Sequence, residues 1–341
     1  MMEQRILIVG PSWVGDMVMA QTLFKVLKQQ YSDVIIDVLA PAWSRPILER
    51  MPEVNRSIDM PVGHGSLALK ARHQLGKALR EHQYQQSIVL PNSLKSALVP
   101  LWAKIPKRTG WRGEMRYGLL NDIRPLDKSR YPLMIERFIA LAYPKGTKLP
   151  SQLPRPELVS ISENVTAARK KFGLTSDAPV LALCPGAEFG EAKRWPPEYY
   201  AEVARTKIQE GWQVWLFGSA KDRPGCENIR QMLDGAANNL AGETSLAEAV
   251  DLLSVADAVI SNDSGLMHVA AALERNLVVV YGSSSPEFTP PLNDNKAIVR
   301  LGLECSPCFK RDCPLGHLDC LKKLEPARVI KSINMVLDQH D

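Results

Sequence analysis

The sequence predicts an α/β protein of two domains, each with a parallel β-sheet flanked by helices. Short β-rich runs alternate with helical patterns through the first half, and the alternation restarts at PVLALCPG. Between the halves lies KGTKLPSQLPRPEL, a proline-rich polar stretch typical of a linker. We therefore expect two doubly wound sheets facing a central cleft, in domains spanning residues 1–155 and 156–325, followed by a C-terminal helix at 326–341.

The expected elements follow in order along the chain. The first half contributes strands at RILIVG, DVIIDVLA and QSIVLP, and helices at residues 16–30, 67–82, 93–104 and 131–142. The second half contributes strands at PVLALCPG, WQVWLFG, ADAVISND and LVVVYG, and helices near residues 197–210, 222–233, 246–255 and 264–273. A proline starts the last helix, at residues 326–337. Ligands of such sheets bind at the carboxyl ends of strands, so residues that follow strands are the site candidates.

Composition limits the class of protein. The 341 residues are 45% hydrophobic and 23% charged, which supports two folded cores and argues against wholesale disorder. No stretch reaches the roughly 18 apolar residues of a membrane span, and the apolar run after Arg5 is too short for a signal peptide. We expect a cytoplasmic protein. Its net charge of +5 fits an ordinary solvated surface or an anionic partner, such as a phosphate ester or an acidic membrane face.

The first site candidate is GPSWVGD, which directly follows the first strand and opens a helix. The segment lacks the glycine spacing of a dinucleotide-binding fingerprint, which argues against an NAD-dependent enzyme. Asp16 places a carboxylate at a helix N-terminus, where backbone N–H groups favour the ionised form. Asp16 is either a functional carboxylate or a plain helix cap.

Two further candidates follow strands in the second half. CPGAE, with Glu188, is followed by Lys193 and Arg194, two cations able to neutralise charge on a diphosphate leaving group. NDSGLMH carries Asp263, Ser264, Gly265, Leu266 and His268, and its turn opens a helix whose N-terminus is suited to a diphosphate. The alternatives are a solvated basic loop for the first segment and a capped turn without a ligand for the second.

Smaller features also fit a nucleotide site. Asp222 follows a strand and can bind a ribose hydroxyl, and Thr244 precedes a helix near the expected base. Each is also ordinary turn chemistry. In the first half a basic and aromatic segment suits an acceptor that carries phosphates or carboxylates; its candidate contacts are Lys95, Arg108, Arg112 and Arg116. Nucleic acid also uses such residues, but the mild overall charge argues against it.

Four cysteines crowd near the C-terminus. Cys305, Cys308, Cys313 and Cys320 depart from the paired C-x-x-C spacing of zinc ribbons, and only the first pair resembles a metal knuckle. A thiol-rich structural loop is favoured over a zinc site here, and disulfides are disfavoured in a reducing compartment.

Taken together, these segments resemble the ADP-heptose:lipopolysaccharide heptosyltransferases of glycosyltransferase family 9. The resemblance runs from residue 6 to about residue 290. It rests on GPSWVGDMVM, DVLAPAW, RMPEVN, LPNSLKSALVP, RTGWRGEMRYGLLND, CPGAEFG with AKRWP, LFGSAKD, LAGET and NDSGLMHVAAAL.

The resemblance implies a GT-B fold of two Rossmann-like domains, with the acceptor bound by the N-terminal domain and the ADP-sugar by the C-terminal domain. It implies inverting transfer of L-glycero-D-manno-heptose from ADP-heptose to the first heptose of heptosyl-Kdo2-lipid A, without a required divalent metal. The acceptor would be met at the inner face of the cytoplasmic membrane by a peripheral enzyme.

Position by position, the resemblance makes Asp16 the general base and Lys193 the lysine that faces the sugar diphosphate. Asp263, Ser264, Gly265 and Leu266 match the donor pocket. Asp222 and Thr244 align with positions near the ribose and adenine; the family has a glutamate where Asp222 stands. Glu188, Arg194 and His268 complete the expected donor side.

Three other functions stay open from the sequence. One is a heptosyltransferase of the type that adds the first heptose. Another is a nucleotide-sugar epimerase or hydrolase, which would share the donor site but need no basic acceptor face. The third is a non-catalytic nucleotide-binding or nucleic-acid-binding module, whose binding would fall steeply with salt.

Overall fold

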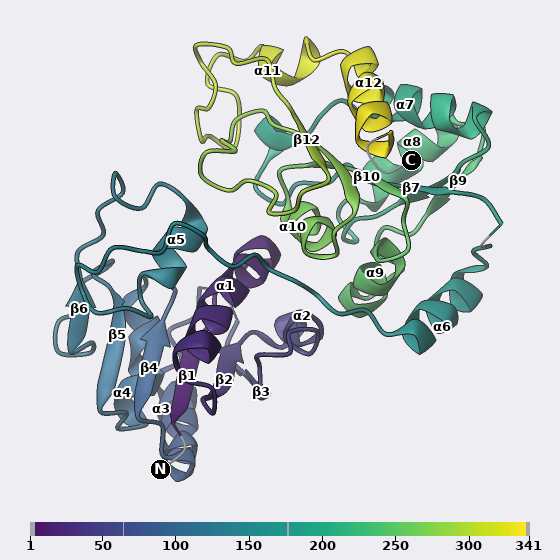
Figure 1. Ribbon diagram of the computed structural model, residues 1–341. Coiled ribbons are helices and arrows are strands. Elements are labelled where there is room, and N and C mark those ends of the chain that lie inside the picture. The colour runs from purple at the N-terminus through teal and green to yellow at the C-terminus, as the bar shows by residue number, and fades with distance from the viewer. Residues whose placement is uncertain (1–3, 64, 176, 339–341) are drawn as a thin grey trace. The chain divides into compact units, whose positions relative to one another are not determined.

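A computed structural model describes residues 4–63, 65–175 and 177–338 of the chain. These divide into two compact units, Met1–Pro156 and Glu157–Asp341, hereafter unit 1 and unit 2. Each unit contains one six-stranded sheet whose paired strands all run parallel (Figure 1). The predicted fold class, α/β with two parallel sheets, is confirmed.

The sheet of unit 1 has the order β3-β2-β1-β4-β5-β6. Its strands are β1 (Arg5–Val9), β2 (Ile35–Ala40), β3 (Arg56–Asp59), β4 (Gln86–Val89), β5 (Lys107–Trp111) and β6 (Asp122–Arg124). The central strands β1, β2 and β4 are apolar and almost wholly buried, as their sequences predict. The sequence analysis missed β3, β5 and β6, which are short and carry charged residues because they lie at or next to an edge.

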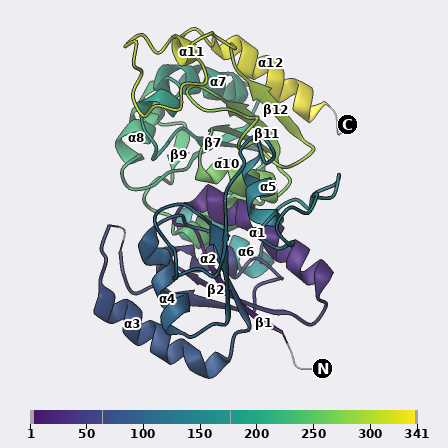
Figure 2. The same ribbon diagram turned by 90° about the vertical axis from the view of Figure 1, so that its left-hand side faces the viewer.

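Helices cover both faces of this sheet. They are α1 (Val14–Gln30), α2 (Arg45–Leu48), α3 (Leu69–Ala78), α4 (Leu98–Trp102) and α5 (Met134–Ile139). Helix α1 packs against α5, and α3 packs against α4 on the other side of the strands (Figure 2). The predicted helix at 93–104 is broken into a 3-10 turn, Leu94–Ala97, and the short α4.

A buried arginine holds together the loops that follow β4 and β5. Arg116 is 0% exposed. Its guanidinium donates to the backbone oxygens of Pro91, at 2.6 Å, and Trp111, and to the side chain of Asn92 at 3.4 Å. Arg116 lies in the loop after β5, and its acceptors lie in the loop after β4 and at the last residue of β5, so one side chain fixes the two loops to each other at the carboxyl edge of the sheet.

The sheet of unit 2 has the order β12-β11-β10-β7-β8-β9. Its strands are β7 (Val180–Cys184), β8 (Gln213–Leu216), β9 (Ala237–Asn239), β10 (Ala258–Asn262), β11 (Asn276–Val280) and β12 (Lys296–Val299). The four interior strands are close to fully buried, which explains their continuous apolar sequences. The edge strands β9, with the polar sequence ANN, and β12, with the sequence KAIV, were not predicted.

The helices of unit 2 are α6 (Ser162–Phe172), α7 (Pro197–Gln209), α8 (Arg223–Met232), α9 (Leu246–Leu253), α10 (Gly265–Ala272), α11 (Asp319–Lys322) and α12 (Pro326–Leu337). Helix α7 packs against α8 and α12, while α9 packs against α6 and α10. Trp195 anchors the start of α7: it is 1% exposed, and its indole N–H donates to the Leu324 oxygen at 2.8 Å. No helix in the described residues is long and apolar enough to cross a membrane.

We predict that Arg116→Met destabilises the protein by about 3 kcal/mol, because it removes the donors to buried backbone oxygens of two loops. Chemical denaturation followed by circular dichroism measures the change. The matched control is Arg112→Met, since Arg112 is exposed in the same segment; its stability should stay within about 0.5 kcal/mol of the wild type. Equal stability of the two variants would show that Arg116 does not hold the loops.

Candidate functional site

The carboxyl edge of the unit 1 sheet carries a pocket of about 780 Å³. Residues that follow β1, β2, β3, β4 and β5 all contribute to its lining, because parallel strands deliver their outgoing loops to the same edge. The volume lies in the range of pockets that hold small molecules. Unit 1 therefore has room for a sugar at the edge where the sequence analysis expects a site.

Asp16 lines this pocket from the first turn of α1 and is half-buried. Helix α1 begins at Val14, directly after the extended residue Trp13, whose side chain makes no cap hydrogen bond. A carboxylate in the first helical turn is stabilised by the unsatisfied N–H groups of that turn. The chain thus presents an acidic group to the pocket from a rigid element.

Two tryptophans that the sequence analysis did not select also line the pocket. Trp13 follows β1 and Trp43 follows β2, and both are exposed. Large aromatic side chains at a pocket can pack against the apolar face of a ligand while their N–H groups bond polar atoms. The rule that residues after strand ends form the site applies to both and would have identified them.

The four predicted acceptor residues separate into two groups. Lys95 lines the pocket, and its ammonium donates to the Ser66 oxygen at 3.5 Å. Arg112 directly follows β5 and is exposed. These two remain candidates for contact with an anionic acceptor.

The predictions for Arg108 and Arg116 need correction. Arg108 lies near the amino end of β5, away from the pocket edge, and its guanidinium donates to the Leu119 oxygen at 2.6 Å and the Ile105 oxygen at 2.7 Å. Arg116 is buried in the loop contacts described above, and burial lowers its pKa to about 10. Both cations hold the backbone of unit 1 and neither lines the pocket.

In unit 2 the predicted donor residues gather where β7, β8, β9 and β10 end. The tip of β10 is organised by Asn262, which is fully buried. Its side-chain NH2 donates to the Pro185 oxygen at 2.7 Å, and its side-chain oxygen accepts from the backbone N–H of Trp195 at 3.1 Å and from the Tyr200 hydroxyl at 3.0 Å. The loop after β7 and the start of α7 are thereby fixed beside the turn that begins α10. Asn262 belongs to the NDSGLMH motif, and the sequence alone did not indicate its structural role.

The central contact of this region is an ion pair. Lys193 Nζ lies 2.6 Å from Asp263 Oδ2, with side chains only 17% and 5% exposed respectively. The ammonium also lies 5.0 Å from the centroid of the Phe189 ring, a cation–π distance. The two predicted donor-side residues, 70 positions apart in the sequence, therefore meet.

Helix α10 begins immediately after this pair. Ser264 occupies its N-cap position in an extended conformation, and its hydroxyl lies 3.2 Å from that of Ser261. The first N–H groups of a helix have no partner within it, so Gly265 and Leu266 present donors suited to an anion. Asp263, Ser264 and Lys193 stand at the same helix end, so the geometry can receive a phosphate group.

His268 lies one turn into α10 and is buried. Burial is the main reason that its pKa falls to about 4; Asp263 opposes the shift and Lys193 adds to it. The imidazole is therefore neutral at neutral pH. It therefore adds no third charge beside the ion pair of Lys193 and Asp263.

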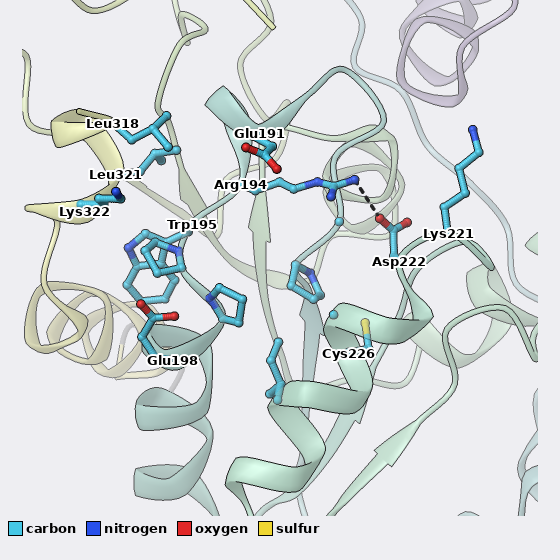
Figure 3. A pocket seen from close by; sticks show the side chains of 16 residues that line it. Glu191, Arg194, Trp195, Glu198, Lys221, Asp222, Cys226, Leu318, Leu321 and Lys322 are labelled. Atoms are coloured by element: carbon cyan, nitrogen blue, oxygen red, sulfur yellow. Dashed lines mark hydrogen bonds and ion pairs between the residues drawn. The ribbon is translucent and has the colours of Figure 1, made fainter. Parts of the chain in front are cut away.

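Arg194 and Asp222 form a second contact, which Figure 3 shows in a pocket of about 360 Å³. Their side chains point toward one another, with Arg194 Nη2 3.4 Å from Asp222 Oδ1. Asp222 also accepts from the Ser219 N–H at 2.9 Å. A Cβ added to Gly186 would lie 2.5 Å from the Asp222 carboxyl carbon, so a glycine is needed for the close approach of this carboxylate.

The remaining predicted donor residues lie on the surrounding loops. Glu188 is exposed and pairs with Lys221 at 2.7 Å. Thr244 is half-buried after β9, where its hydroxyl donates to the Leu240 oxygen at 3.2 Å. Both follow strands, as expected, but neither lines the pocket of Figure 3.

The segment that carries Cys305, Cys308, Cys313 and Cys320 follows β12 and contacts the loop that carries Lys193. All six cysteines are free thiols. The backbone oxygen of Arg311 accepts a hydrogen bond from the Ala192 N–H at 3.0 Å. The Arg311 guanidinium lies 5.5 Å from the centroid of the Phe189 ring. Backbone N–H groups, led by that of Leu318, lower the pKa of the Cys313 thiol. Within residues 4–63, 65–175 and 177–338, no three histidine, cysteine or acidic side chains are placed to hold a metal ion.

Comparison with known proteins identifies this arrangement. Residues 72–319 match glycosyltransferase family 9 (heptosyltransferase). The chain is 52% identical to lipopolysaccharide heptosyltransferase 2 of Escherichia coli (strain K12), over 99% of each chain. It is 48% identical to lipooligosaccharide heptosyltransferase 2 of Haemophilus influenzae, over 97% of this chain and 99% of that protein.

A solved structure is similar along the whole chain. The structure of E. coli ADP-heptose LPS heptosyltransferase II superposes with a TM-score of 0.89 at 50% identity, covering 99% of both chains. The similarity therefore spans both units of the chain. The chain is an enzyme that belongs to glycosyltransferase family 9, the heptosyltransferases.

Proposed function

We propose that this enzyme transfers L-glycero-D-manno-heptose from ADP-heptose to the first heptose of heptosyl-Kdo2-lipid A, with inversion at the anomeric carbon. The full-length similarity to proteins named heptosyltransferase 2 supports the choice of donor and acceptor. The observation that carries the chemistry is the half-buried carboxylate of Asp16 in a pocket with room for a sugar. The acceptor's lipid would place the enzyme at the inner face of the cytoplasmic membrane.

In this proposal unit 1 binds the acceptor and Asp16 acts as general base. One carboxylate oxygen takes the proton of the acceptor hydroxyl while that hydroxyl oxygen forms a bond to the anomeric carbon of the donor. The bond from the anomeric carbon to the ADP oxygen breaks, and ADP leaves with the electron pair. Lys95 and Arg112 are the cations available to anionic groups on the acceptor.

Unit 2 binds the donor and meets the charge that develops on ADP. Lys193, Arg194 and the N-terminus of α10 at Ser264 and Gly265 offer positive charge and N–H donors. Asp222 and Thr244 would contact the nucleoside in this proposal. Asp263 holds the Lys193 ammonium in place before the diphosphate arrives.

Replacement of the base should stop transfer without loss of the donor. We expect Asp16→Asn to lower the rate of transfer about 10²–10⁴-fold, because the amide cannot accept the proton. Purified enzyme is mixed with ADP-heptose and heptosyl-Kdo2-lipid A, and mass spectrometry reports one added heptose. Calorimetry should give wild-type affinity for ADP-heptose.

Two controls accompany this test. Asp33→Asn changes an exposed aspartate just before β2 and should keep wild-type rates. Kdo2-lipid A without heptose should be a poor acceptor; a preference for it would assign the enzyme to the type that adds the first heptose. Wild-type turnover by the Asp16→Asn variant would show that Asp16 is not the general base.

The loss of Lys193 should slow departure of ADP. We expect Lys193→Ala to reduce kcat about 10²–10³-fold, since it removes positive charge from a water-poor site where the charge on the leaving group develops. Steady-state release of ADP measures the effect. Lys331→Ala, on the exposed side of α12, is the matched control. Near-normal kcat in Lys193→Ala would contradict the proposed role.

Removal of divalent metal should leave transfer intact. Because Lys193, Arg194 and the α10 N-terminus are proposed to supply the stabilisation of the leaving group, we expect EDTA to change kcat by less than about twofold. The assay is the same release of ADP, run after dialysis against chelator with and without added magnesium. A rate that collapses with chelator and returns with magnesium would contradict this part of the proposal.

A further inference from the structure

Unit 1 exposes large apolar side chains along the edge where its pocket opens. Leu67 and Leu69 lie between β3 and the start of α3, Leu94 follows β4, and Met115 and Tyr117 follow β5. Met115 is 79% exposed and Tyr117 is 62% exposed. We call these five residues the apolar rim. Contiguous exposed apolar side chains mark sites of contact with a membrane, a protein or a ligand.

The segments that carry the apolar rim are joined to one another by hydrogen bonds. The Leu94 N–H donates to the Glu114 carboxylate at 2.6 Å, and the Glu114 N–H donates to the Asn92 oxygen at 3.0 Å. The Lys95 ammonium reaches the Ser66 oxygen at 3.5 Å. These hydrogen bonds hold the segments that carry the rim next to one another, in addition to the contacts of Arg116.

The charges beside the apolar rim are mainly positive. Lys70, Lys95 and Arg112 contribute three positive charges, against one negative charge from Glu114. That one carboxylate accepts a backbone hydrogen bond within the surface. Apolar side chains beside lysine and arginine suit the interface of an anionic bilayer, where the former enter the headgroup region and the latter meet lipid phosphates.

The apolar rim is also continuous with the proposed acceptor pocket. Gly63, Ser93, Lys95 and Glu114 line that pocket and come from the same three segments as the rim. An acceptor sugar attached to a lipid would keep its acyl chains in the bilayer while the sugar occupies the pocket. This link to the acceptor, which rests on the proposed function, selects a bilayer over a protein as the occupant.

We infer that the apolar rim, with Lys70, Lys95 and Arg112 beside it, is the surface by which this enzyme docks on an anionic membrane. Docking would place the pocket opening at the headgroups that carry the acceptor. The surface then raises the rate at which the enzyme meets a membrane-borne acceptor and leaves the rate of the chemical step unchanged.

Vesicle sedimentation with the full-length enzyme tests the inference. The probes are vesicles of phosphatidylcholine alone and vesicles of phosphatidylcholine with phosphatidylglycerol, at low and high salt. We expect the wild type to bind the anionic vesicles, more weakly as salt rises, and the Met115→Ser, Tyr117→Ser double variant to bind about tenfold more weakly. Tyr31→Ser is the matched control, because Tyr31 is an exposed aromatic residue of unit 1 at the far end of α1.

A transfer assay separates failure of the docking surface from failure of the proposed function. The double variant should keep wild-type kcat on a deacylated acceptor and lose about tenfold in kcat/KM on vesicle-embedded acceptor. Absence of transfer by the wild type to either acceptor would reject the proposed function. Vesicle binding would still test the apolar rim, because it does not depend on transfer. The inference would be overturned if the wild type did not bind anionic vesicles, or if the double variant bound them as strongly as the wild type.

Discussion

Parallel strand pairing is the constraint on which both sites depend. Each strand of a parallel sheet sends its outgoing chain to the same edge, so residues far apart in sequence are brought together there. In unit 2 this places Lys193, which follows β7, against Asp263, which follows β10, because those strands are neighbours. In unit 1 it gathers five loops around the pocket that contains Asp16.

The ion pair between Lys193 and Asp263 has a cost as well as a use. Two charges that are largely removed from water must compensate each other, and loss of either partner leaves the other uncompensated. The pair holds the lysine at the end of α10, where the backbone N–H groups of the helix already favour an anion. In the proposed function, a diphosphate arriving at this point would meet an ammonium that is already positioned, which would lower the cost of ordering a long side chain during the reaction.

The sequence predicted these features unevenly, for physical reasons. Interior strands such as β7 and β10 were found because burial on both faces demands continuous apolar runs. Edge strands such as β3 and β9 were missed because their polar sequences are indistinguishable from loops. Asp263 and Lys193 were selected from their places after strands and from the family resemblance, and the structure brings them into contact.

The directions of the arginine side chains could not be predicted from the sequence. A cluster of cations in sequence indicates an anion-binding face, yet it does not reveal where each guanidinium points. Arg108 and Arg116 turn inward and bond backbone oxygens, whereas Arg112 stays exposed. Trp43 was not selected, although it follows β2 and is exposed at the pocket, where the rule for residues after strand ends applies.

The buried guanidinium of Arg116 also restricts how this enzyme can diversify. Its donors reach the Pro91 oxygen in the loop after β4 and the Trp111 oxygen at the end of β5, so an insertion or deletion just after either strand would pull the guanidinium and these oxygens apart. Loop lengths on this side of unit 1 are consequently coupled. Relatives that adopt a different sugar are expected to exchange side chains at loop tips while they keep the spacing from β4 to Pro91, the spacing from Trp111 to Arg116, and the arginine itself.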